Sequence, residues 1–415
     1  MAINLTMVKL DTTPSESNWA TTRSQHHLPA ALCYDSSSRV RRQLVTIRNT
    51  LDTVTIRGFK TIKALEAFEP RHLTALIGAN GAGKSNFISF FRMLSWALSG
   101  PGNLPLHVGQ QGGASALLHD GQETTREIEA ELTLSNEDGD RNQYAFKLFY
   151  AANDTLVFAE EKYRFVRSGH PNPGNWVEAG AGHTSPRLLT QAASDQTAYV
   201  IGNILKKIIV HQFHNTSYTA RMRSKWDVDD SRWLKEDAAN IAPVLLRLRT
   251  DELLCYQRIV AVLRLLLPFF MDFDLEPRYN KVLLCWRERN SDRVFSVAQA
   301  SDGMLRAIAL VTLLLQPHED LPDVLILDEP ELGLHPYAIN VTGELIRSVA
   351  QTVQVIVATQ STLLIDCFEP EEIVVVERHG RGSSFKRLEE EPLTEWLKEY
   401  SISELWEKNV VGGRP

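Results

Sequence analysis

The sequence predicts an α/β fold with a mostly parallel sheet, an antiparallel β-meander lobe and an inserted helical lobe. Between residues 301 and 376, helical patterns alternate with short apolar runs, which is typical of parallel strands joined by helices. Along 128–134 and 144–150, apolar and polar residues alternate, which indicates antiparallel strands. Helical periodicity dominates 236–267, between these two regions.

Composition narrows the class of protein. The 415 residues are 43% hydrophobic and 23% charged, a globular balance. The net charge of −7 argues against a global basic field that would attract nucleic acid or an anionic membrane. No apolar run is long enough to predict a membrane span. The four cysteines form no zinc-binding or disulfide pattern, so we expect a reducing, cytoplasmic setting.

The elements follow in order along the chain. Residues 1–50 lack a sustained period, and we expect them to be a disordered N-terminal extension or sequence upstream of the natural start. We expect a single domain at 51–415, made of a core (51–167 and 281–390), a helical lobe (190–275) and a helical tail (391–415). The main expected strands are 54–59, 73–77, 281–287, 293–297, 323–327, 353–358 and 372–376, and the expected core helices are 84–98, 301–315 and 336–351.

A glycine-rich loop lies between the strand at 73–77 and the helix at 84–98. Its sequence G-A-N-G-A-G-K-S fits the pattern G-x-x-x-x-G-K-[ST] in its expected context. Such a loop wraps backbone N–H groups around a phosphate chain, with Lys84 on the β- and γ-phosphates and Ser85 on Mg²⁺. The predicted nucleotide contacts are Gly78, Ala79, Asn80, Gly81, Ala82, Gly83, Lys84, Ser85 and Asn86. A glycine-rich turn without a ligand is the disfavoured alternative.

A second motif is the apolar strand V-L-I-L followed by two acids and a proline. Asp328 is the candidate ligand for Mg²⁺, and Glu329 is the candidate catalytic group that orients or deprotonates the attacking water. The alternative is an acidic N-cap before a helix. We disfavour it because buried strands rarely end in paired acids without a cation nearby.

The stretch A-S-D-G-M-L-R begins a helix at Ser301, and on local evidence it is only a helix start. Because it directly precedes the acid-ended strand, it resembles the signature motif of ABC-type ATPases in its Ser-x-Gly form. The resemblance implies that Ser301, Asp302 and Gly303 contact the γ-phosphate of an ATP held by another subunit. The stretch 331–336 resembles the D-loop of the same class, and His335 there is more consistent with a structural or dimer-seam role than with catalysis.

These motifs, in this order, resemble those of ABC-type ATPases of the SMC, RecF and OLD kind. The stretch I-R-G-F-K-T-I at 56–62 is similar to the first strand of SMC heads. Residues 54–415 more closely resemble the bacterial predicted AAA/ABC-type ATPase family, through S-A-L-L-H-D-G (115–121), F-H-N-T-S (213–217) and L-W-E-K-N-V-V-G-G-R-P (405–415). The resemblance implies ATP and Mg²⁺ as cofactors and an ATP-dependent homodimer. Related ATPases occur in antiviral, anti-phage systems, often with a separate nuclease.

The region between Ser85 and Ser301 has no sustained heptad repeat, so we expect a compact head without a coiled-coil arm. The resemblance makes Gln212 the candidate Q-loop residue, which senses Mg²⁺, although His211 and His214 compete for that role. The tail after Val376 is too short for the nuclease domain of OLD proteins, so any nuclease is expected to be a partner chain.

Basic residues near this junction suggest either a nucleic-acid groove or a solvated charged surface. They are Lys206, Lys207, Arg221, Arg223 and Lys225. The solvated surface is favoured because Asp227, Asp229 and Asp230 follow directly, so binding of DNA or RNA is the weaker expectation.

The strand at 353–358 stops at the polar triplet Thr359, Gln360 and Ser361. Many ABC-type ATPases place a histidine where Gln360 stands. A glutamine keeps a donor and an acceptor but cannot become cationic. We therefore expect Gln360 to sense the γ-phosphate without a pH-dependent charge, and we count it with Lys84 and Glu329 as catalytic.

Three functions compete for this set of motifs. The leading one is an ATPase that dimerises on ATP and switches a nucleic-acid-linked or effector-linked process, with no membrane partner. A nucleotide-binding subunit of a membrane transporter is disfavoured by the SMC-like first strand and the β-meander. A scaffold that holds ATP without hydrolysing it is disfavoured by the intact Lys84, Asp328 and Glu329.

Overall fold

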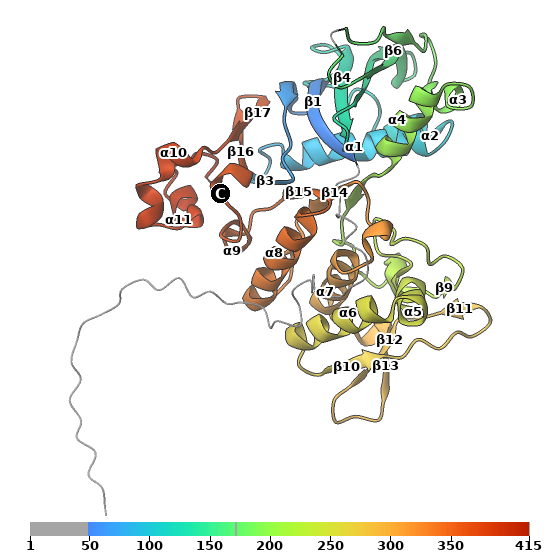
Figure 1. The fold of residues 1–415 in the computed structure, drawn as a ribbon, viewed down its shortest axis with the longest axis vertical. Coiled ribbons are helices and arrows are strands. Elements are labelled where there is room, and N and C mark those ends of the chain that lie inside the picture. The colour runs from blue at the N-terminus through green and yellow to red at the C-terminus, as the bar shows by residue number, and fades with distance from the viewer. Residues whose placement is uncertain (1–48, 171, 415) are drawn as a thin grey trace, which may run out of the picture. The chain divides into compact units, whose positions relative to one another are not determined.

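The computed structural model of the chain describes residues 49–170 and 172–414 (Figure 1). The extension predicted at 1–50 lies outside the described residues, except that Asn49 and Thr50 begin strand β1. The described residues adopt an α/β fold with parallel and antiparallel strands, which confirms the predicted fold class.

A six-stranded, mostly parallel sheet forms the centre of the fold. Its strand order is β17 (Gly382–Arg387), β16 (Ile373–His379), β3 (Leu73–Ile77), β15 (Gln354–Ala358), β14 (Val324–Asp328) and β8 (Ile208–His211). Only β17 runs antiparallel to its neighbour. Every residue of β3, β14 and β15 is buried, which explains why these strands have continuous apolar runs rather than alternating patterns.

The second six-stranded sheet is antiparallel throughout and contains the predicted meander. Its order is β2 (Ile62–Phe68), β1 (Asn49–Phe59), β4 (Glu127–Asn136), β5 (Arg141–Ala151), β6 (Thr155–Val166) and β7 (Val177–Glu178). Alternate residues of β4 and β5 face the core, as their sequence pattern predicts.

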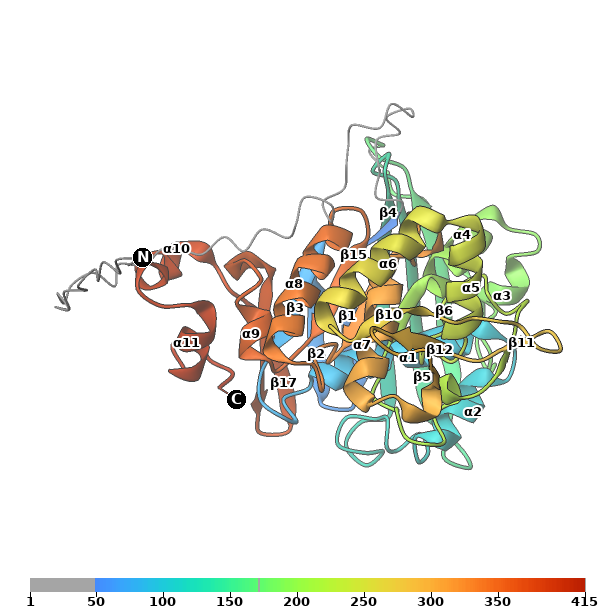
Figure 2. The same ribbon diagram turned by 90° about the horizontal axis from the view of Figure 1, so that it is seen from below.

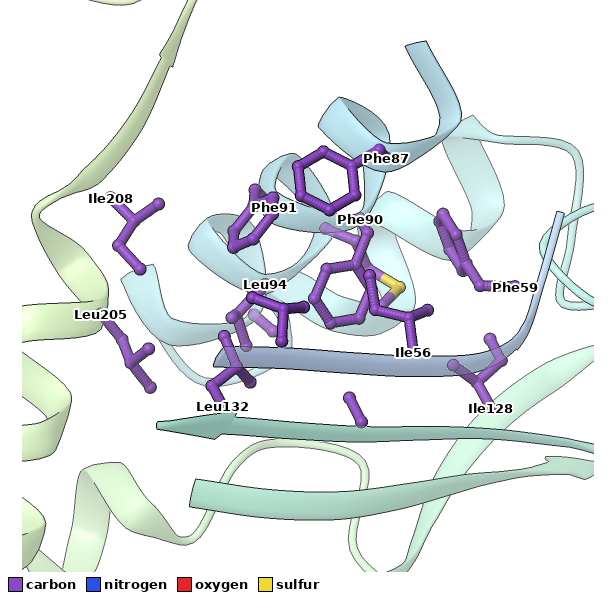
Figure 3. Close-up of a cluster of buried hydrophobic side chains, with 14 of the residues drawn as sticks. Ile56, Phe59, Phe87, Phe90, Phe91, Leu94, Ile128, Leu132, Leu205 and Ile208 are labelled. Atoms are coloured by element: carbon purple, nitrogen blue, oxygen red, sulfur yellow. The ribbon is translucent and has the colours of Figure 1, made fainter. Parts of the chain in front are cut away.

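Helix α1 (Lys84–Ser99) packs against both sheets. It contacts β8, β14 and β15 of the parallel sheet. Towards the antiparallel sheet, its residues Phe90 and Leu94 lie close to Ile56 of β1 and Leu132 of β4 (Figure 3). The ring of Phe90 meets that of Phe59 edge-on, with 5.7 Å between centroids. The helix that begins at the glycine-rich loop is therefore fixed from two directions by one hydrophobic core.

The remaining helices fall into two groups. Helices α2 (Asn103–Gln110), α3 (Leu188–Gln191) and α4 (Gln196–Lys206) pack near α1 and the meander. Helices α5 (Ile241–Asp251), α6 (Leu253–Leu266), α7 (Asp302–Leu314) and α8 (Pro336–Ala350) form the second group. In this group α6, α7 and α8 lie side by side (Figures 1 and 2). No helix among residues 49–170 and 172–414 is both long and apolar enough to cross a membrane.

The structure differs from the expected lobe boundaries in two places. Helix α4 packs on α1, β5 and β6, so its buried residues join the core rather than a helical lobe starting at residue 190. Residues 281–297, expected in the core, instead supply β11 (Lys281–Val282), β12 (Cys285–Glu288) and β13 (Val294–Ser296). These pair with β9 (Trp226–Asp227) and β10 (Phe270–Phe273) in two small antiparallel sheets. Antiparallel pairing with local partners, rather than the central sheet, satisfies their backbone groups.

The helical pattern at 236–267 is also interrupted. Helix α5 starts at Ile241, and Glu252 separates it from α6. Within α6, Tyr256, Val260 and Leu263 are buried, whereas Leu253 at the first position is 51% exposed.

Within the tail, residues 402–413 pack on the core. In α11 (Ile402–Glu407), the backbone and hydroxyl of Ser403 donate to the carboxylate of Asp366. The indole of Trp406 is fully buried and donates to Gly413 O at 2.6 Å. The Gly413 N–H then donates to Glu377 in β16.

Gln354, at the start of β15, joins the two large sheets. Its Oε1 accepts from the Leu51 N–H at 2.8 Å, and its Nε2 donates to Leu51 O and Pro70 O, each at 3.1 Å. The side chain is 2% exposed, so these groups have no solvent alternative.

Replacing this junction with an apolar side chain should destabilise the fold. We expect Q354L to lower the free energy of unfolding by about 2 to 4 kcal/mol, because the N–H and C=O of Leu51 in β1 and the carbonyl of Pro70 lose their partner. Urea unfolding measures this. The control is Q351L, at an exposed position in the turn that precedes β15, which should stay within about 0.5 kcal/mol of the wild type. Equal effects of the two substitutions would contradict the assignment.

Candidate functional site

The candidate site lies at the carboxyl edge of the parallel sheet. Leu327 of β14 pairs with His211 of β8, and Asp328 pairs with Ala358 of β15. Ala358 in turn pairs with Leu76 of β3. This register brings the residues that follow each strand to one edge, so the glycine-rich loop, the paired acids, the polar triplet and Gln212 converge there.

The glycine-rich loop packs against β16 and β17. Gly78 and Gly83 have φ angles of 150° and 124°, and a Cβ on Gly83 would overlap the hydroxyl of Ser383. That hydroxyl contacts Ala82 O at 2.5 Å and Thr61 Oγ1 at 2.7 Å. Ser383 was not predicted from the sequence, since nothing local marks a serine in an edge strand as a support for a distant loop.

The side chain of Lys84, the first residue of α1, is buried against the glycine-rich loop. Its side chain is 4% exposed, and Nζ donates to Gly78 O at 2.5 Å and Ala79 O at 3.1 Å. Burial lowers the pKa of Lys84, while the nearby carboxylates of Glu329 and Asp328 act to raise it. The ammonium group is thus a desolvated cation bonded only to neutral carbonyls, an environment that favours an anionic ligand.

Asp328 has one bound and one free carboxylate oxygen. Oδ2 accepts from Gln212 Nε2 at 2.9 Å, whereas Oδ1 is buried and has no hydrogen-bond partner. Burial raises the pKa of Asp328. Ser85 is exposed in the first turn of α1. A buried carboxylate oxygen without a partner and a serine hydroxyl at the end of the glycine-rich loop are oxygen ligands of the kind that Mg²⁺ prefers, so these residues fit that cation.

Glu329 is held in a strained backbone conformation, with a φ of 46°. Its N–H donates to Ala358 O at 2.8 Å, which ties it to the end of β15. Gln360 Nε2 donates to Glu329 Oε1 at 2.9 Å and to Asn80 Oδ1 at 2.6 Å. Gln360 therefore bridges the candidate base and the glycine-rich loop.

The three competing residues after β8 lie in different places. His211 is buried, and desolvation lowers its pKa to about 4, so the ring is neutral. Gln212 contacts the Asp328 carboxylate. His214 Nε2 lies 3.1 Å from Asp328 O and 3.8 Å from Glu329 Oε2. The structure thus brings Gln212 and His214, but not His211, into hydrogen-bond contact with the paired acids.

Glu331 is a site residue that the motifs did not reveal. It is 9% exposed, and its Oε1 accepts from Thr359 Oγ1 at 2.5 Å and from the Gln360 N–H at 3.3 Å. Thr359 Oγ1 also accepts from the Ser361 N–H. Glu331 therefore fixes the turn that carries Gln360. The repeated acid in D-E-P-E was the available signal.

The signature-like residues belong to a separate network. Ser301 caps α7 and is exposed, and a Cβ on Gly303 would lie 2.7 Å from Gly333 O in the D-loop-like segment. Arg223, with a side chain 9% exposed, donates to Val297 O, Ala300 O and Asp302 Oδ1. Across the described ranges, no hydrogen bond joins residues 301–303 to residues 78–86.

The basic residues at the junction are largely engaged. Arg223 is committed to the segment before α7. Lys207 pairs with Asp323 at 3.5 Å, and Arg221 pairs with Asp237 at 3.2 Å. These contacts favour the interpretation as a charged surface over a nucleic-acid groove.

Fold and site together define the class: this is an AAA/ABC-type ATPase fold of the SMC-like kind. Residues 73–366 match the family model described as "AAA domain, putative AbiEii toxin, Type IV TA system", and the chain belongs to that family. No curated protein sequence matches the chain.

Two solved structures show the likeness in fold. One is an Smc head bound to the C-terminal winged-helix domain of ScpA, with a TM-score of 0.56 and 16% identity over 83% of this chain and 99% of that chain. The other is an Smc head with an extended coiled coil, bound to the C-terminal domain of ScpA derived from Pyrococcus furiosus. Its TM-score is 0.55, with 15% identity over 85% of this chain and 99% of that chain.

The buried carboxylate of Asp328 should cost stability in the nucleotide-free protein. Because its pKa is raised in the folded state, the folded protein holds this proton more tightly, and stability is lost as pH rises through the carboxyl range. We expect D328N to match the wild type near pH 4 and to melt at a higher temperature at pH 7. Thermal melting without divalent cations tests this, with D229N at an exposed position as the control. A D328N variant no more stable at pH 7 would contradict it.

Proposed function

We propose that the chain is an ATPase that binds ATP with Mg²⁺, dimerises on ATP and acts as a switch through hydrolysis. The observation that carries this proposal is the convergence of Lys84, Asp328, Glu329 and Gln360 at one edge of the parallel sheet. They come from three segments far apart in the sequence, and each has the chemistry needed for a different part of phosphoryl transfer to water.

Each residue would have a distinct role. The backbone N–H groups of the glycine-rich loop and Lys84 bind the phosphates, and Ser85 and Asp328 hold the Mg²⁺ ion. The ion, when bound, supplies charge neutralisation on the phosphate oxygens. Glu329 accepts a proton from the attacking water, and Gln360 orients the Glu329 carboxylate through the 2.9 Å contact.

The position of Ser301 supports the proposed dimer. Ser301 is exposed at the N-terminus of α7, and the segment before it is held by Arg223, whereas its own glycine-rich loop has other partners. An exposed, preorganised helix N-terminus with a hydroxyl suits the γ-phosphate of an ATP bound to a second copy. We propose that Ser301 and Gly303 make this contact across the dimer.

The proposed output of the switch involves a partner chain. Solved Smc heads of similar fold bind domains of ScpA, so a head of this kind can carry a partner protein. The family model describes a putative toxin of a toxin–antitoxin system. We propose a cytoplasmic switch linked to nucleic acid or to an effector chain, such as a separate nuclease in anti-phage defence.

Replacing the candidate base should separate binding from turnover. We expect E329Q to bind ATP and Mg²⁺, to hydrolyse ATP at least about 100-fold more slowly, and to accumulate as a dimer. Size-exclusion chromatography with light scattering, with and without ATP, measures the dimer.

Two further variants make this experiment decisive. K84A should not bind ATP, and S301R should bind ATP but stay monomeric because the larger side chain blocks the dimer contact. An E329Q protein that binds ATP yet never dimerises would refute the sandwich. Wild-type protein that binds ATP without turning it over would instead support a scaffold.

Gln360 should affect turnover more than binding. We expect Q360L to lower kcat by about 10- to 100-fold, because Glu329 loses a hydrogen bond to its charged carboxylate, with ATP affinity nearly unchanged. The matched variant Q360H keeps a donor and should retain more activity. Steady-state ATP hydrolysis gives kcat and KM, and a wild-type kcat in Q360L would remove Gln360 from the mechanism.

A further inference from the structure

The side-chain amide of Gln212 is held on both sides. Gln212 follows β8, and the pairing of His211 with Leu327 places it beside Asp328. Arg92 on α1 donates from Nη2 to Gln212 Oε1 at 2.9 Å. On the other side, Gln212 Nε2 lies 2.9 Å from Asp328 Oδ2 and 2.9 Å from His214 Nδ1.

The chemistry of these partners permits only one orientation of the amide. A guanidinium has donors alone, and a carboxylate has acceptors alone. Rotating the amide by 180° would place its NH₂ against Arg92 and its oxygen against the Asp328 carboxylate, so both contacts would become repulsive.

This orientation divides the two oxygens of Asp328 between two tasks. Oδ2 is occupied by the donor from Gln212, and Oδ1 is left buried without a partner. The backbone oxygen of Asp328 also has a partner, since it lies 3.1 Å from His214 Nε2. Because His214 Nδ1 faces the Gln212 amide donor, Nε2 carries the ring proton and donates to that backbone oxygen.

We propose that Gln212 is a positioning residue that acts on the metal through Asp328, as a hydrogen-bond donor, and that Arg92 sets its orientation. The side-chain oxygen of Gln212 is not a metal ligand in this chain. The inference rests on the proposed function, since it assumes that Asp328 Oδ1 faces a divalent cation beside ATP. It differs from what the ABC-type resemblance implies, in which the Q-loop glutamine senses Mg²⁺ itself.

Arg92 and the proposed metal ligand Ser85 lie on the same helix. Arg92 lies on the helix that begins at Lys84, and α1 packs against β8 and β14. Gln212 thus links the side chain of Asp328 to Arg92 on α1. The same helix carries Ser85, the other proposed metal ligand. Both ligands are thus positioned by one rigid element, which favours a fixed distance between them.

The test is metal affinity rather than turnover. The full chain, saturated with the non-hydrolysable analogue AMP-PNP, is titrated with Mn²⁺, and free Mn²⁺ is measured by electron paramagnetic resonance. We expect Q212E to weaken Mn²⁺ binding by about tenfold or more, because Asp328 loses a donor and gains a repulsive neighbour. If the Gln212 oxygen were a ligand, the added carboxylate would tighten binding instead, and that result would overturn the proposal. Q351E, an exposed substitution of equal charge, should leave Mn²⁺ affinity unchanged.

A double-mutant cycle isolates Arg92. R92M removes a positive charge, and its effect in a Q212A background measures that charge effect alone. We expect R92M to cost at least about threefold more Mn²⁺ affinity when Gln212 is present, since the amide then loses its fixed orientation. A gain specific to the Gln212 background would mean that the freed oxygen binds the metal, and additivity would mean that Arg92 does not act through Gln212. Either result would overturn the proposal.

A failure of the proposed ATPase function would be seen in nucleotide binding rather than in Mn²⁺ affinity. If wild-type protein does not bind AMP-PNP, or if K84A binds it equally well, then the nucleotide site itself is absent and both proposals fall. If AMP-PNP binds normally to wild type and Q212E alike but Mn²⁺ affinity rises in Q212E, only the donor role is wrong. Thermal melting of each variant verifies that it is folded.

Discussion

The register of the parallel sheet is the constraint on which the candidate site depends. Because Asp328, Ala358 and Leu76 are paired across three adjacent strands, the segments that leave these strands emerge at one edge. A slip of one residue would turn alternate side chains to the opposite face. The strands are buried on both faces, so the register is fixed by packing on α1 and α8 rather than by any ligand.

At that edge the fold tolerates groups that cost stability. Three ionisable side chains are buried there, those of Lys84, Asp328 and Glu331. Desolvation lowers the pKa of the lysine and raises the pKa of the two acids, which favours the neutral form of each. Glu329 adds a left-handed backbone conformation that costs about 1 to 3 kcal/mol. The surrounding hydrophobic core overcomes these costs, and a phosphate chain with its cation is the kind of ligand that would relieve them.

Local motifs revealed the part of the site whose chemistry is contained in contiguous residues. The glycine-rich loop and the paired acids were predictable because phosphate-binding loops require glycine and lysine at fixed spacing, and buried acids require a reason. Ser383, Arg92 and Glu331 were not, since each acts on a residue brought near only by the tertiary fold. The lobe boundaries were misplaced for a related reason: the periodicity of α4 shows an apolar face but not which surface covers it.

The segment after β8 connects the candidate site to the signature-like helix through polar contacts of fixed geometry. The ring of His214 contacts Asp328 O, while its backbone oxygen accepts from Arg306 of α7 at 3.0 Å. The same guanidinium also donates to Phe213 O and Leu332 O. Because the donors of an arginine share one plane, these contacts cannot be relaxed independently. The segment 213–214 therefore contacts both the backbone of Asp328 at the proposed ATP site and Arg306 in the helix that follows Ser301.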